Sequence, residues 1–166
     1  DRLDFYPGAY DVSFGHYAGG IIDSETRPGR KDAPAHGEIE LKLYDLMALV
    51  ETKLPGDVTV VAAGHYGFPS YLIHAFDSRA NVSYWDYQLR VDWRGLTLEA
   101  IGSYDDLRVS NPGGRQTGVN GQFLVEFHRL QLREQYRRGR FELEAGIVGG
   151  LDRMALFSGQ GVQKLG

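Results

Sequence analysis

The sequence of 166 residues predicts an all-β fold, an antiparallel meander of about seven long strands preceded by a small separate segment. Three observations predict it. Apolar and polar residues alternate without a break from Trp85 to Trp93, which is typical of a strand with one apolar and one polar face. Short reversals that contain glycine separate runs of this kind. No apolar run approaches the roughly 20 residues of a transmembrane helix.

The strand that ends at Trp93 shows the alternation most clearly. Large apolar or aromatic side chains occupy every second position, at Trp85, Tyr87, Leu89, Val91 and Trp93. The residues between them are polar and include Gln88 and Arg90. The sequence therefore assigns these two sets of side chains to opposite faces.

The chain reverses at Arg94-Gly95 and repeats the pattern on its return. Leu96, Leu98 and Tyr104 continue the apolar face, and Glu99 continues the polar face. Ile101 falls among the polar positions and interrupts the alternation. Residues 82–107 are therefore expected to form one long hairpin.

The length of this hairpin favours a membrane protein. A strand in a soluble protein has about 5–6 residues, whereas a membrane-crossing strand needs about 9–11. Trp85 and Trp93 would lie roughly 20 Å apart in height. An outer-membrane barrel carries an apolar band about 25 Å tall between two aromatic girdles. We therefore interpret the sheet as an open piece of a transmembrane β-barrel, with a strand of a large soluble sheet as the alternative.

This interpretation assigns surroundings to both faces of the strands. A charge that faces lipid is costly, so we expect charged and amide side chains to face the lumen. The expected lipid-facing and girdle residues are Trp85, Tyr87, Leu89, Val91, Trp93, Leu96, Leu98 and Tyr104. The expected lumen-facing residues are Gln88, Arg90, Glu99, Glu142 and Glu144.

From residue 37 onward the chain reads as a run of hairpins. We expect strands at residues 37–44, 47–54, 58–67, 82–93, 95–107, 120–136 and 140–153. The reversals on one side are tight and polar, at Pro55-Gly56-Asp57, Arg94-Gly95 and Arg137-Arg138-Gly139. On the other side only the reversal near Asp45 is short, and the connections around 68–81 and 108–119 are long. Such an asymmetry is typical of outer-membrane barrels.

One strand departs from a single apolar phase. Residues 120–136 place Phe123, Val125 and Phe127 on one face and then Leu130, Leu132 and Tyr136 on the other. A single inserted residue would explain the change, so we expect a β-bulge near His128-Arg129.

Residues 1–30 differ in composition from the hairpins. Short strands are expected at 3–6 and 21–27, joined by a loop rich in glycine. Ile21 and Ile22 are adjacent, so this segment buries both of its faces instead of one. We expect it to pack against the polar face of the sheet and not to extend the meander. The expected division is residues 1–30 as one unit, 31–36 as a linker and 37–166 as a partial barrel.

Composition and spacing argue against several classes of site. The formal net charge of −4 shows no basic footprint for nucleic acid, and the absence of cysteine excludes disulfides. The five histidines have no metal-ligand spacing, and no nucleophile–base motif appears. Asp105-Asp106 are expected to be solvated and not to bind a cation. We expect neither enzymatic activity nor a cofactor.

The first 27 residues carry a composite pattern. The segments Asp1–Tyr10 and Phe14–Arg27 combine a charged and hydrophobic strand, an aromatic-glycine pair, a double glycine and a final Thr-Arg. This pattern resembles the end of the plug domain of TonB-dependent outer-membrane receptors. Leu54-Pro55-Gly56-Asp57 is similar to the first periplasmic turn of that family. The residues that carry the plug motif are Phe14, Gly15, Gly19, Gly20, Thr26 and Arg27.

The resemblance implies an active transporter of scarce nutrients such as iron chelates, cobalamin or glycans. Its location would be the bacterial cell outer membrane, its partners would be outer-membrane lipid and the TonB complex, and its energy would arrive through TonB. The family's barrel has 22 strands, so this chain would be a fragment whose sheet stays open. The TonB-contacting segment of the family has no counterpart here.

Two other classes compete with this reading. A soluble all-β ligand-binding module of lipocalin or sandwich type would not depend on detergent. An enzyme embedded in a barrel, such as a lipid hydrolase, would react with a serine-directed probe. The sequence does not identify the ligand.

Overall fold

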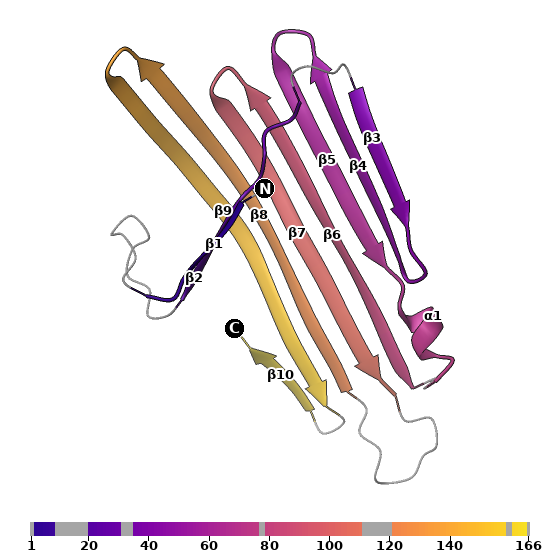
Figure 1. Ribbon diagram of the computed structural model, residues 1–166. Helices are drawn as coiled ribbons and strands as arrows, with labels where there is room; N and C mark the ends of the chain where they lie inside the picture. The colour runs from indigo at the N-terminus through magenta and orange to yellow at the C-terminus, as the bar shows by residue number, and fades with distance from the viewer. Residues whose placement is uncertain are drawn as a thin grey trace.

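The computed structural model describes residues 2–8, 20–30, 35–76, 79–110, 121–158 and 161–165. Most of them form one antiparallel sheet of eight strands in the order β10-β9-β8-β7-β6-β5-β4-β3 (Figure 1). The strands are β3 (Ala35–Leu41), β4 (Asp45–Leu54), β5 (Val58–Gly67), β6 (Ala80–Trp93), β7 (Leu96–Val109), β8 (Gly121–Arg138), β9 (Phe141–Ser158) and β10 (Gly161–Leu165). Each strand pairs with its neighbour in the chain, which confirms the predicted meander.

The sheet is open. β3 and β10 stand at the two ends of the strand order. β3 is the first strand of the expected meander, whereas the last expected strand, residues 140–153, continues in β9 to Ser158. β10 then pairs with the end of β9, from Met154 to Ser158. The short β10 carries too little alternation to be recognised in the sequence.

Each of the three tight turns contains a glycine with positive φ, a conformation that glycine adopts without steric cost. Arg94 and Gly95 both have positive φ, 49° and 93°, as a two-residue hairpin turn of type I′ requires. Gly56 and Asp57 have φ of 87° and 62°, and Gly139 has φ of 60°. These turns join long strands at one end of the sheet (Figure 1). The other end carries the short helix α1 (Ser70–Ile73), which replaces part of the loop expected after β5.

The expected bulge near His128-Arg129 is wrong. β8 pairs with β7 from Leu96↔Glu134 to Val109↔Gly121 without a slip, and its pairing with β9 is also continuous. The apolar residues of β8 change face along the strand without any slip in the register. Near the loop end Phe123 and Phe127 share a face with Arg90, whereas toward the turn end Leu130 lies on the opposite face.

Residues 2–6 and 21–25 do not continue the meander. β1 (Arg2–Tyr6) and β2 (Ile21–Glu25) form a separate antiparallel pair, from Arg2↔Glu25 to Tyr6↔Ile21 (Figure 1). Residues 26–30 then lead from β2 across one face of the large sheet, where they contact Glu51 and Arg90. We call this the inner face, and we call the opposite face the outer face.

Candidate functional site

The outer face carries a continuous apolar band. Because the pairing is unbroken, residues at one level form rows across the strands. One row consists of Ala62, Leu89, Ala100, Leu130 and Gly149, and the next consists of Val60, Val91, Leu98, Leu132 and Ile147. Neither row contains a polar side chain.

Much of this band lies exposed. Leu130 is 56% exposed, Ile147 72% and Leu132 40%. Among the described residues only Val61, Leu124 and Ala155 are fully buried apolar side chains. Monomeric soluble proteins seldom expose contiguous apolar patches larger than a few hundred Å². The outer face therefore needs an apolar covering.

Aromatic side chains flank the band at both ends. Tyr66, Trp85 and Tyr104 form a row toward the loop end, and the rings of Trp85 and Tyr104 stack with centroids 5.7 Å apart. Trp93 and Tyr136 lie toward the turn end, where Tyr136 packs edge-on against Phe141 at 6.4 Å. The apolar band therefore lies between two aromatic levels over β5 to β7, and the loop-end row continues into Glu126 on β8 and Arg153 on β9.

The register gives the faces of the residues singled out in the sequence. All of the expected lipid-facing residues lie on the outer face: Trp85, Tyr87, Leu89, Val91, Trp93, Leu96, Leu98 and Tyr104. All of the expected lumen-facing residues lie on the inner face: Gln88, Arg90, Glu99, Glu142 and Glu144. Ile101 lies on the inner face as well, opposite Gln88.

A hydrogen-bond network joins Thr26 to the inner face. Arg90 donates from Nη1 to the Thr26 carbonyl at 2.7 Å and to its hydroxyl at 2.9 Å. The Thr26 hydroxyl donates to Glu99 at 2.6 Å. Arg90 also forms a bidentate pair with Asp92, at 2.9 Å for both bonds, and Thr97 donates to the same carboxylate at 2.8 Å. Since Arg90 is 6% exposed, these contacts satisfy a buried charge.

A second group of contacts holds residues 26–30 at β4, two strands away from Arg90 on β6. Glu51 is 1% exposed, forms an ion pair with Arg27 and lies 3.7 Å from Arg30. Gly29 lies so close to β5 that an added Cβ would come within 3.0 Å of Val61. Residues 26–30 are therefore held by charge and by close packing at several points.

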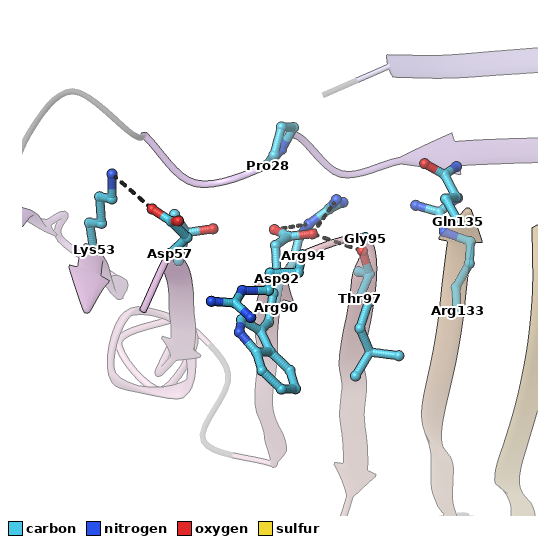
Figure 2. A pocket seen from close by; sticks show the side chains of 13 residues that line it. Pro28, Lys53, Asp57, Arg90, Asp92, Arg94, Gly95, Thr97, Arg133 and Gln135 are labelled. Carbon is cyan, nitrogen blue, oxygen red and sulfur yellow. Dashed lines mark hydrogen bonds and ion pairs between the residues drawn. The ribbon is translucent and has the colours of Figure 1, made fainter. Parts of the chain in front are cut away.

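A hollow of about 450 Å³ opens beside this segment at the turn end of the sheet (Figure 2). Pro28 borders it from the docked segment, and Lys53, Asp92 and Arg133 border it from the strands. Lys53 and Asp57 form an ion pair at 3.6 Å within it. The charged side chains that line it are largely paired with one another. We therefore interpret it as a gap between residues 26–30 and the inner face of the sheet.

The network joins some predicted residues and leaves others apart. Thr26, Arg90 and Glu99 are brought together, and the adjacent Arg27 pairs with Glu51 instead. Glu142 and Glu144 lie near the start of β9, where they pair with Arg137 at 2.6 Å and with Gln135 at 2.9 Å. Of the remaining motif residues, Gly20 packs near the Phe5 ring, and Phe14, Gly15 and Gly19 lie outside the described residues.

Sequence reasoning missed Glu51, Asp92 and Arg30. Glu51 and Asp92 occupy polar positions in strands of alternating polarity. The alternation predicts the face on which each side chain lies, but it does not predict which residue each one contacts. Asp105, expected to be solvated, is exposed, whereas Asp106 is 6% exposed and accepts a hydrogen bond from Gln122 at 2.7 Å.

Two histidines, His65 and His128, serve as hydrogen-bonding groups. His65 lies 2.9 Å from Asp86, and His128 lies 3.1 Å from the Tyr87 hydroxyl. His16 lies outside the described residues. No cluster of three or more potential metal ligands occurs in the described part of the chain.

No helix among the described residues has the length and apolar character needed to cross a membrane. Comparisons with protein-family models, with curated proteins and with solved structures find no match.

Proposed function

We propose that this chain is part of the wall of an outer-membrane active transporter, and that residues 1–30 belong to a plug held inside it. One observation carries the proposal. The sheet exposes an apolar band between aromatic levels on its outer face, and on its inner face it binds a separate chain segment through buried charges. Lipid suits the first face, and a polar lumen suits the second.

The transported ligand would be a nutrient too large or too scarce for diffusion, of the iron-chelate, cobalamin or glycan class. The energy would come through TonB, as the resemblance of residues 1–27 implies.

Bilayer insertion tests the membrane half of the proposal. The chain is refolded with and without phosphatidylcholine vesicles, and folding is followed by the electrophoretic mobility of the unheated sample. We expect a compact, heat-modifiable form only with vesicles. A chain that is monomeric, folded and soluble without lipid or detergent would instead be a soluble binding module, and the proposal would be wrong.

Hydrogen exchange tests the plug half. In the vesicle-bound chain, the amides of Leu3–Tyr6 and Ile21–Glu25 are expected to be protected, because they pair in a sheet and lead into the docked segment. Full exchange of both strands within seconds would show that residues 1–30 are a loose tail.

A further inference from the structure

A polar hollow of about 190 Å³ lies on the outer face, at the loop end of β6 and β7. It is lined by Asn81, Ser83, Tyr104, Asp106 and Arg108. Asn81 pairs with Arg108 and Ser83 pairs with Asp106, in the two rows just beyond the aromatic pair Trp85↔Tyr104. The hollow therefore shares a face with the apolar band and begins where the aromatic row ends.

A buried carboxylate organises this hollow. Asp106 is 6% exposed, and it accepts hydrogen bonds from Gln122 at 2.7 Å and from the Tyr104 hydroxyl at 3.5 Å. It also forms an ion pair with Arg108 at 2.6 Å. The Arg108 side chain is itself 59% exposed, and a guanidinium has five N–H donors, so it keeps donors for a ligand while Asp106 fixes its position.

The lining selects a chemical class. It offers the Asn81 amide group, whose oxygen accepts from Ser70 at 2.6 Å, together with the hydroxyls of Ser83 and Tyr104 and the Arg108 guanidinium. The charges of Asp106 and Arg108 cancel, so the lining attracts neither a net anion nor a net cation. A neutral group with several hydroxyls satisfies such a surface best.

The position of the hollow selects the source of that group. Tyrosine and tryptophan side chains in girdles lie at the level of lipid headgroups. Trp85 and Tyr104 form such a row directly beside the hollow. We propose that this hollow binds the sugar headgroup of a glycolipid whose acyl chains lie along the apolar band. This inference rests on the proposed membrane location of the outer face.

The test uses the full chain in nanodiscs of phosphatidylcholine mixed with a monoglucosyl diacylglycerol, and native mass spectrometry counts the lipids that stay bound. We expect glucolipid adducts in clear excess over their share of the bilayer. Asp106→Asn is expected to lower that enrichment about tenfold, because Arg108 loses its charged anchor. Ser83→Ala, directly opposite Asp106 in the strand pairing, is expected to lower it about threefold.

Matched controls lie on the inner face of the same strands. Asp105→Asn and Ser103→Ala remove a carboxylate and a hydroxyl from the inner face of β7, so they should leave the glucolipid enrichment unchanged. Free glucose at the same concentration should not displace the lipid. No enrichment of glucolipid, an equal loss in both sets of variants, or displacement by free glucose would overturn the inference. Each of these outcomes leaves bilayer insertion intact, whereas a chain that fails to insert overturns the proposed function as well.

Discussion

Arg90 and Thr26 lie 64 residues apart in the chain, yet Arg90 Nη1 is 2.7 Å from the Thr26 carbonyl oxygen. The same guanidinium forms a bidentate pair with Asp92. One buried cation therefore joins the wall of the sheet to the segment that crosses its inner face. The predictions below test this junction and the two faces that it separates.

Replacing Arg90 should release residues 26–30. In Arg90→Gln, the Asp92 carboxylate loses its buried partner and Thr26 loses two hydrogen bonds, at a cost of about 3 kcal/mol. Hydrogen exchange at residues 26–30 should accelerate, while exchange in β6 and β7 changes little. Arg94→Gln, in the exposed turn after β6, is the control and should leave the segment protected. Equal acceleration in both variants would contradict the role of Arg90.

Glu51 offers an independent test of docking. Glu51→Gln removes the buried carboxylate that pairs with the half-exposed Arg27 and lies near Arg30, and hydrogen bonds to charged groups contribute about 1.5–3 kcal/mol. Trypsin should then cleave after Arg30 at least about tenfold faster. Glu38→Gln, an exposed position on the inner face of β3, should keep the original rate. Unchanged cleavage in Glu51→Gln would show that Glu51 is not needed to hold the segment.

Adjacent positions on β6 should respond differently to charge. Leu89→Arg places a guanidinium in the apolar band, at a cost of about 2–4 kcal/mol, whereas Gln88→Arg places it on the inner face. The heat-modifiable form in vesicles should therefore decrease strongly in the first variant and little in the second. Equal tolerance of both arginines would contradict the assignment of lipid to the outer face.

Gly102 is required by its neighbours on the outer face. An added Cβ would lie 2.5 Å from both His128 Nδ1 and the Tyr87 ring, so Gly102→Ala should separate Tyr87 from His128 and destabilise the sheet by about 1–3 kcal/mol. Gly149→Ala has no heavy atom within 4 Å of its Cβ and should be neutral. Unfolding of the vesicle-bound chain in urea measures both, and similar midpoints would refute the packing argument.

Local alternation was enough to predict most of the sheet. The faces of Leu89 and Arg90 follow from a period of two residues, and the turn at Arg94-Gly95 follows from the conformational freedom of Gly95. The bulge was wrongly predicted because a change of apolar phase has two causes, a slipped register or a change in what covers each face. At Phe127 and Leu130 the second cause applies, and a single strand contains no information that separates them.

The site depends on partners that alternation does not identify. Arg90 was placed on the polar face, but its pairing with Thr26 requires knowledge of where residues 26–30 cross the sheet. Glu51 differs from other polar residues of β4 only through Arg27 and Arg30, which reach it from outside the sheet. Such contacts arise from tertiary geometry, and the sequence pattern contains no period that reports them.

The unbroken pairing from β3 to β9 restricts where this chain can change in length. A residue inserted within β7 would exchange the faces of every side chain on one side of the insertion, so charges such as Glu99 would enter the apolar band. The two-residue turn at Arg94-Gly95 is too short to accommodate the inserted residue. Insertions and peptide tags should therefore be tolerated best in the long connections at the loop end, such as the one between β5 and β6. Variation in chain length should therefore accumulate at the loop end of the sheet, while the level of each strand residue along the sheet stays fixed.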